Sequence, residues 1–160
     1  MSSSSPVRDE AKQRALRLVR RLLRYRPRSI AEVRAYLTSR GLTRELRDEV
    51  IADSRRRGWL DDQAVAKLLT TGLADRGYGS ERIRRRLLEA GLDERLIKDS
   101  GDDEARARAV AAEFLSRGRL SREQAHARLA RRLSSRGFQA DLIERVLTET
   151  LGPPPDPGIK

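Results

Sequence analysis

Val33-Arg-Ala-Tyr-Leu37-Thr-Ser-Arg-Gly41-Leu42 follows a pattern that returns twice, as Ile83-Arg-Arg-Arg-Leu87-Leu-Glu-Ala-Gly91-Leu92 and Leu129-Ala-Arg-Arg-Leu133-Ser-Ser-Arg-Gly137-Phe138. In each copy, two apolar residues four positions apart mark one face of a helix. The glycine predicts the end of that helix, because a left-handed C-terminal turn forms most easily without a Cβ. A further Leu lies four positions beyond each copy, at Leu46, Leu96 and Leu142. This agreement predicts three tandem repeats.

Polar residues in front of the apolar patterns predict where the helices begin. The expected caps and capping boxes are Ser29-x-x-Glu32, Thr43, Ser80, Asp93 and Ser121-x-x-Gln124. One more helix is predicted ahead of each glycine-containing pair, over residues 12–25, 62–76 and 103–117. The pairs Asp61-Asp62 and Asp102-Asp103 are expected to cap the second and third of these helices.

The apolar spacing of three and four residues throughout the chain, with no strand pattern, predicts an all-α fold. We expect three three-helix repeats, each similar to a helix-turn-helix, over residues 12–62, 63–101 and 102–151. A charged fraction of 37% favours an elongated array over a sphere, because an array has more surface for its volume. Residues 1–11 and the proline-rich residues 152–160 are expected to be disordered tails.

The composition restricts the partners and the compartment. The formal net charge is +11, and only four of the 35 basic residues are Lys. A G+C-rich genome can explain the choice of Arg over Lys but not the net charge, which favours nucleic acid, an acidic protein surface or anionic lipid. The chain has no Cys and no apolar run of membrane-spanning length or signal-segment type. We therefore expect a cytoplasmic protein, and no membrane partner.

The positive charge is concentrated in the first repeat, where residues 12–62 contain 15 basic and seven acidic residues. Helical spacing places several arginines on exposed faces, where they are candidates for binding a partner. The candidates are Arg14, Arg17, Arg20, Arg21 and Arg24 in the first repeat, Arg82, Arg84 and Arg85 in the second, and Arg131 and Arg132 in the third. The alternative is that they form solvated faces, partly neutralised by nearby acids.

The residues needed for catalysis or metal binding are not assembled in this sequence. His126 is the only histidine, so neither a zinc site nor a Ser-His-Asp triad is expected. Gly77-Tyr78-Gly79 follows a helix and lacks the Lys-Ser/Thr of a phosphate loop, which indicates a turn. We expect a protein that is not an enzyme and that has no cofactor and no metal. Trp59 and Tyr78 are expected to pack between repeats, and base stacking is the alternative role.

Several segments, taken in order, resemble the RecX family, the regulators of the bacterial RecA recombinase. They are Arg57-Gly-Trp-Leu-Asp-Asp62, Arg76-Gly-Tyr-Gly79, Gly91-Leu92, Leu133-Ser-Ser-Arg-Gly-Phe138 and the opening Ala15-Leu16 helix with Arg26-Pro-Arg-Ser29. The resemblance covers about residues 14–150. The sequence departs from the family pattern at Val65, where an aromatic residue is common, and at Arg47 and Ser54, where apolar residues are usual. The third helix of the second repeat is also short, ending near Ser100-Gly101.

The resemblance implies three three-helix repeats in a bent array that binds in the groove of the RecA–DNA filament. It further implies inhibition of the ATPase and strand-exchange activities of RecA, and restraint of recombination and the SOS response, by a protein without catalytic residues. We expect a monomer. The alternative function is direct DNA binding, as a transcription factor with helix-turn-helix-like units.

Overall fold

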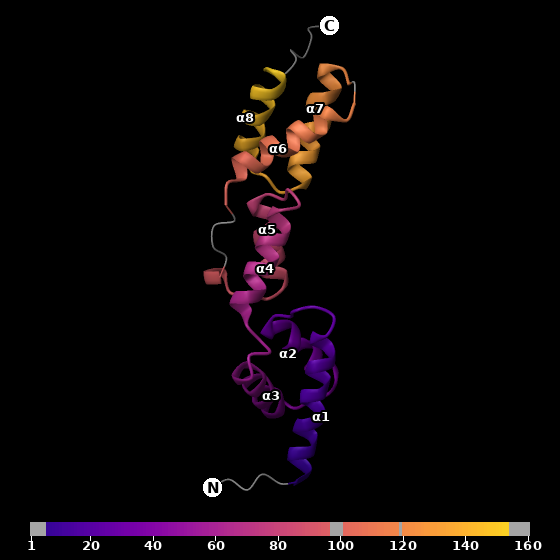
Figure 1. The fold of residues 1–160 in the computed structure, drawn as a ribbon, viewed down its shortest axis with the longest axis vertical. Coiled ribbons are helices and arrows are strands. Elements are labelled where there is room, and N and C mark those ends of the chain that lie inside the picture. Colours follow the sequence, from indigo (N-terminus) through magenta and orange to yellow (C-terminus); the bar gives the residue numbers. More distant parts are fainter. Residues whose placement is uncertain (1–5, 97–100, 119, 154–160) are drawn as a thin grey trace. The chain divides into compact units, whose positions relative to one another are not determined.

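The computed structural model describes residues 6–96, 101–118 and 120–153, and these residues form helices and turns without a strand (Figure 1). The predicted all-α fold is confirmed. The elements are α1 (Pro6–Leu23), α2 (Ile30–Ser39), α3 (Arg44–Arg56), α4 (Asp62–Ala74), α5 (Ser80–Glu89), a 3₁₀ turn η1 (Glu94–Leu96), α6 (Asp103–Ser116), α7 (Arg122–Ser135) and α8 (Ala140–Leu151).

The helices form two compact units. Unit 1 contains residues 1–67 and 88–96, and unit 2 contains residues 68–87 and 97–160. The division passes through α4 after Lys67 and through α5 after Leu87, so the units do not coincide with three separate repeats. The repeat boundaries at 62/63 and 101/102 remain a prediction.

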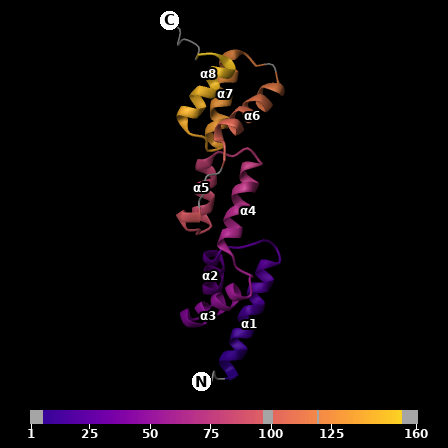
Figure 2. The same cartoon turned by 60° about the vertical axis from the view of Figure 1, so that its left-hand side comes forward.

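Unit 1 has its core where α1, α2 and α3 meet, and these helices lie together in both views (Figures 1 and 2). The buried residues are Ala15, Leu16, Val19, Val33, Leu37, Val50, Ile51 and Leu60. Val33 and Leu37, the apolar pair of the first copy, are fully buried, as the helical spacing predicts. Ser54, a departure from the family pattern, is buried but satisfied, because its Oγ donates a hydrogen bond to the Val50 carbonyl at 2.7 Å.

Unit 2 has an analogous core between α6, α7 and α8, which also lie together in both views (Figures 1 and 2). It contains Ala107, Val110, Ala111, Leu129, Leu133, Phe138, Leu142, Ile143, Val146 and Leu147. Leu129 and Leu133 are fully buried, and the side chain of Ile83 on α5 is only 1% exposed. The paired positions of the sequence pattern are therefore core positions in all three copies.

The predicted helix ends are confirmed at the three matched glycines. Gly41, Gly91 and Gly137 all have left-handed backbones, with φ between 68° and 81°. Gly91 and Gly137 also lie in close contact with other segments. A Cβ on Gly91 would overlap the Cβ of Ala31, and one on Gly137 would overlap the backbone nitrogen of Arg82, whereas Gly41 faces open space. Gly91 and Gly137 therefore join one repeat to the start of a helix in the preceding repeat.

Most side-chain caps occur where the sequence predicts them, but the cap predicted at Ser80 was wrong. Ser80 is the first residue of α5, and its Oγ donates to Asp103 instead of accepting from the helix. Ser29 and Glu32 form a complete capping box on α2, and Thr43 caps α3. Ser121 accepts a hydrogen bond from the Gln124 N–H on α7, but the glutamine side chain does not complete the predicted box in the described residues. Asp93 accepts from the backbone N–H of Arg95, at the start of the η1 turn.

The first helix begins earlier than expected. α1 starts at Pro6, so residues 6–11, expected in a disordered tail, are helical. Proline is favoured at the first position of a helix, where no backbone N–H is needed, and Asp9 suits the positive end of the dipole. Arg8 also forms an ion pair with Glu49 of α3. The start of α1 at Pro6 was not predicted, because residues 6–11 contain few apolar residues to mark a helical face.

Other expected ends shift by a few residues or lie outside the described residues. α1 ends at Leu23 rather than residue 25, α4 at Ala74 rather than 76, and α6 at Ser116 rather than 117. Gly152 and Pro153, expected in the C-terminal tail, are described, and Arg122 donates a hydrogen bond to the Pro153 carbonyl at 2.8 Å. The expectations for residues 1–5, 154–160 and the end of the short helix at 97–100 lie outside the described residues.

Candidate functional site

The five predicted arginines of the first repeat lie on α1 or in the turn after it, and all five are exposed. Two of them interact with neighbours. Arg14 pairs with Glu10 at 3.4 Å, and the guanidinium carbon of Arg20 lies 5.5 Å from the centroid of the Trp59 ring. Arg17, Arg21 and Arg24 form no ion pair within the described part of the chain. Among these five arginines, Arg17, Arg21 and Arg24 therefore have the charge most available to a partner.

A groove between α1 and α2 adds residues that the sequence analysis missed. Its volume is about 460 Å³, and its lining consists of Leu18, Arg21, Leu22, Tyr25, Tyr36 and Arg40. The side chain of Tyr25 is in the turn after α1 and is 77% exposed. The guanidinium carbon of Arg40 lies 5.0 Å from the centroid of the half-buried Tyr36 ring. The spacing of Arg21 and Tyr25, and of Tyr36 and Arg40, places each pair on one helical face, a signal that could have found the groove.

The predicted arginines of the second and third repeats lie in unit 2. Arg82, Arg84 and Arg85 are exposed on α5, and Arg131 is exposed on α7, where its Nε donates to the Ala127 carbonyl at 3.3 Å. Arg84 and Arg85 take part in further interactions. The fifth of these residues, Arg132, is half-buried, so α7 offers a partner less charge than the sequence pattern suggested.

Tyr78 is surrounded by arginines from three parts of unit 2. The guanidinium carbons of Arg76, Arg82 and Arg136 lie 5.9, 5.8 and 5.3 Å from the centroid of its ring. Arg136 also donates to the carbonyl of Arg76 at 2.6 Å and to that of Gly77 at 3.1 Å. Arg136 belongs to the third predicted repeat and Tyr78 to the second, so this cluster joins the two segments. Gly77-Tyr78-Gly79 is a turn within it.

Trp59 packs against the core of unit 1, whose buried members all come from residues 12–62. The guanidinium carbons of Arg20 and Arg57 lie 5.5 and 5.2 Å from the centroid of its ring. Trp59 therefore stabilises the first repeat, and its packing between repeats stays a prediction.

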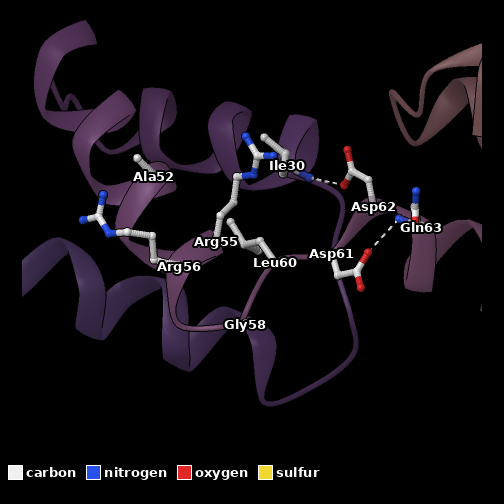
Figure 3. Close-up of a pocket in the computed structure, with 9 residues that line it drawn as sticks. All are labelled: Ile30, Ala52, Arg55, Arg56, Gly58, Leu60, Asp61, Asp62 and Gln63. Carbon is white, nitrogen blue, oxygen red and sulfur yellow. Dashed lines mark hydrogen bonds between the residues drawn. The ribbon is translucent and has the colours of Figure 1, made fainter.

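The pocket at Asp61 and Asp62 is lined by residues with structural roles (Figure 3). It has a volume of about 800 Å³, with Asp61 and Asp62 at one end and Arg56 at the other. Asp61 accepts hydrogen bonds from the N–H groups of Gln63 and Ala64, at 2.9 and 3.1 Å, and so caps α4. Asp62 accepts from the N–H of Ile30 at 2.8 Å, at the start of α2. Both carboxylates are engaged in capping, and the described residues contain no cluster of potential metal ligands.

The same arrangement occurs in unit 2. Asp102 caps its own helix α6, with hydrogen bonds from Glu104 and Ala105. Asp103 accepts from the N–H of Ser80 at 3.0 Å and from its Oγ at 2.6 Å, at the start of α5. In each Asp pair, the first residue caps the helix that follows it, and the second caps an earlier helix, α2 or α5. The capping was predicted from the sequence, but its division between two helices was not.

Two buried or half-buried carboxylates are held ionised by arginines. The hydrogen bond from Arg57 lowers the pKa of Asp53, more than burial raises it, and Arg56 and Lys12 lower it further. Burial raises the pKa of Glu32, but hydrogen bonds from Arg26 and the Ser29 N–H, with the charge of Arg28, lower it below its ordinary value. These acids neutralise part of the arginine charge at α2 and α3.

The fold and its surfaces define a small all-helical protein with exposed arginines and an exposed tyrosine, Tyr25. None of its described helices combines the length and the apolar character that crossing a membrane requires. No family model matches the chain. Two crystal structures share the fold. RecX from Lactobacillus salivarius has a TM-score of 0.74 and 17% identity, and the match covers 88% of this chain and 97% of that one. A second structure, of a regulatory protein RecX, has a TM-score of 0.68 and 18% identity, and the match covers 91% of this chain and 80% of that one.

Curated relatives establish the family. Regulatory protein RecX of Stenotrophomonas maltophilia is 35% identical over 140 residues, which cover 84% of this chain and 83% of that protein. Regulatory protein RecX of Lactobacillus delbrueckii subsp. bulgaricus is 30% identical over 92% of this chain, but the match spans only 57% of its own length. The chain belongs to the RecX family of regulatory proteins.

Proposed function

We propose that this protein is a regulator of RecA that binds the RecA–DNA filament and inhibits its ATPase and strand-exchange activities, thereby restraining recombination and the SOS response. The observation that carries the proposal is the 35% identity to a regulatory protein RecX over most of both chains. The protein acts in the cytoplasm as a monomer, without a cofactor, and catalyses no reaction itself.

The basic faces support the proposal, because a RecA–DNA filament presents phosphates and the net charge of this chain is +11. We place the contact surface on the predicted arginines and give the largest share to Arg17, Arg21 and Arg24, which have no carboxylate partner in the described residues. An ion-paired arginine offers less, since a partner must compete with its carboxylate. Arg14, which is paired with Glu10, and Arg132, which is half-buried, therefore have the smaller shares.

The test compares two triple variants in RecA ATPase and strand-exchange assays. In the first, Arg17, Arg21 and Arg24 are replaced by Gln. In the control, Arg44, Arg56 and Arg117 are replaced by Gln. The control residues are exposed but paired with Asp48, Asp53 and Glu113. Both variants lose three positive charges.

We expect the first variant to lose inhibition and the control to retain most of it, with both helical by circular dichroism. Inhibition by the unmodified protein should also weaken as salt rises. Equal inhibition by the two variants would refute the proposed surface. If the unmodified protein does not inhibit RecA from the same organism, the proposed function itself is refuted.

The second candidate function is direct binding to duplex DNA. It is favoured by the helix–Gly turn–helix segments and by the unpaired arginines of α1, which suit phosphates. Tight binding to naked duplex, together with no effect on RecA, would establish this function instead. Binding should be measured to duplex DNA and to RecA–DNA filaments at the same salt concentration, because salt changes both affinities.

A further inference from the structure

The groove between α1 and α2 differs in composition from two other pockets of the described chain. The pocket at the Asp pair contains two carboxylates, and a pocket of about 530 Å³ on α8 is lined by Asp141, Glu144 and Glu149 with a single arginine. The α1–α2 groove is lined by two tyrosines, two arginines and two leucines, and by no acid. All six residues belong to unit 1. Its chemistry is that of a site for an anion with aromatic or apolar parts.

Tyr25 contributes little to the core of the protein. Its side chain is 77% exposed, whereas an aromatic ring that stabilises a fold is normally buried. The chain has three tyrosines, and the other two, Tyr36 and Tyr78, are half-buried and have arginines over their rings. Tyr25 is thus the tyrosine with a ring available to a ligand, and Leu18 and Leu22 give the adjacent floor an apolar surface.

The charge around the groove is not neutralised. Arg21 lines it, Arg17 and Arg24 lie nearby on α1 and its following turn, and none of the three has an ion-pair partner in the described residues. Arg40 lies over the ring of Tyr36. An aromatic platform next to arginines is the combination that binds single-stranded nucleic acid, with bases stacked on rings and phosphates near guanidinium groups. A duplex fits less well, because its bases are already stacked on one another.

We propose that the groove between α1 and α2 binds single-stranded nucleic acid, with a base stacked on Tyr25 and the adjoining phosphates contacted by Arg21 and Arg40. Tyr36 is the fixed wall of the site, because its ring is held against the unit 1 core. The groove makes no hydrogen-bonding pocket for one base, so binding depends on stacking and charge and has little sequence preference. The inference does not rest on the proposed regulation of RecA.

The experiment titrates the full chain into a fluorescent oligo-dT and follows its anisotropy. An abasic oligomer of the same length, a duplex of the same length and poly-glutamate as a competitor complete the set of probes. We expect oligo-dT to bind more tightly than the abasic oligomer and the duplex. Poly-glutamate should compete weakly, since it supplies charge without bases.

Three variants separate stacking from charge. Tyr25→Ser should weaken oligo-dT binding about tenfold, the effect of losing one stacked base, while binding to the abasic oligomer stays unchanged. Tyr25→Phe should bind like the unmodified protein. The double variant Arg21→Gln, Arg40→Gln should weaken binding to both oligomers and flatten the salt dependence. Arg44→Gln, an exposed arginine of α3, should do neither. Tyr25 is exposed, so these variants should fold, and circular dichroism checks this.

Several results would overturn the proposal. They are unchanged oligo-dT affinity in Tyr25→Ser, equal affinity for oligo-dT and the abasic oligomer, preference for the duplex, strong competition by poly-glutamate, or no binding to any oligomer. Each of these leaves the proposed function intact if the protein still inhibits RecA. If the protein binds oligo-dT but does not inhibit RecA, the proposed function is refuted and the groove proposal stands.

Discussion

The starts of α2 and α5 occupy the same position in two repeats, fifty residues apart in the repeat frame, but they are stabilised in different ways. α2 carries its own capping box, formed by Ser29 and Glu32. At α5, the corresponding positions are Gly79 and Arg82, which cannot form one. The start of α5 instead depends on the following repeat for its hydrogen-bond partners.

The backbone of the following repeat supplies these partners. The N–H of Gly79 donates to the carbonyl of Arg136 at 2.9 Å, and the N–H of Glu81 donates to that of Gly137 at 3.2 Å. Asp103 accepts from Ser80. At α2, the distant partners are Asp62, which accepts from the Ile30 N–H, and the Ala90 carbonyl, to which the Ser29 hydroxyl donates. The first four N–H groups of a helix need partners from outside it, and the two repeats meet this need with local and distant residues in different proportions.

The largest effect is expected from Gly79→Ser, which gives α5 the residue that caps α2. Serine is the better N-cap residue in general, but a Cβ at position 79 would overlap the carbonyl oxygen of Gly137. We expect a loss of about 3 kcal/mol in the free energy of unfolding, measured by urea denaturation. A stabilised variant would show that α5 has room for its own cap and would remove the difference between the two helices.

The second-largest effect on stability is expected from Gly91→Ala, and Gly41→Ala is its comparison. Both residues have left-handed backbones, so each substitution costs about 1 kcal/mol in backbone strain. Only Gly91 also touches Ala31 at the start of α2, and this contact should raise its cost to about 2 kcal/mol or more. The difference in melting temperature between the two variants isolates the contact. If the two variants melt at the same temperature, Gly91 only ends a helix and does not join two repeats.

A third comparison replaces the second residue of each Asp pair. Asp103→Ala removes hydrogen bonds to both the N–H and the hydroxyl of Ser80, whereas Asp62→Ala removes one bond to Ile30. We expect losses of about 2 and 1 kcal/mol, by chemical denaturation. Asp61→Ala, which uncaps α4 only, is the control. A larger loss in Asp62→Ala would mean that α2 depends on its neighbour more than α5 does.

The smallest effect on stability is expected from a change of pH, because the start of α2 contains the acid Glu32 where the start of α5 contains Arg82. The pKa of Glu32 is lowered in the folded protein, so its stabilisation is complete above the ordinary value of 4.5 and is lost as the pH falls through the lowered pKa. Glu32→Gln should therefore cost about 0.5 kcal/mol at pH 7.

The measurement is urea denaturation of both proteins at several pH values between 7 and 3. The difference between the Glu32→Gln variant and the unmodified protein should shrink as the solution is acidified. A difference that stays constant over this range would contradict the assignment of the pH dependence to Glu32.

The sequence predicted those parts of the fold that depend on neighbouring positions. The matched apolar pairs, the glycine ends and the caps at Ser29, Thr43 and Asp102 all follow from spacing within a few residues. The role of Asp103 did not, because its partner Ser80 lies 23 positions earlier and only the packed chain brings the two together. The start at Pro6 was missed because the early turns of α1 contain few apolar residues.

The candidate site was predicted in part for the same reason. Helical spacing was enough to place Arg17 and Arg21 on an exposed face. It did not show that Arg14 is paired with Glu10, that Arg132 is half-buried, or that Tyr25 lies across a groove from Tyr36, since these facts depend on side-chain positions and on a second helix.

The dependence of α5 on later residues has a consequence for protein synthesis, which proceeds from the N-terminus and lets early segments fold first. The start of α2 finds Ser29 and Glu32 as soon as these residues have left the ribosome. The start of α5 has no such local partner, and its N–H groups remain bonded to water until Asp103, Arg136 and Gly137 have been added. When the chain has emerged from the ribosome only as far as about residue 100, we therefore expect a folded first repeat and an incomplete second one, with the apolar face of α5 open to chaperones and proteases.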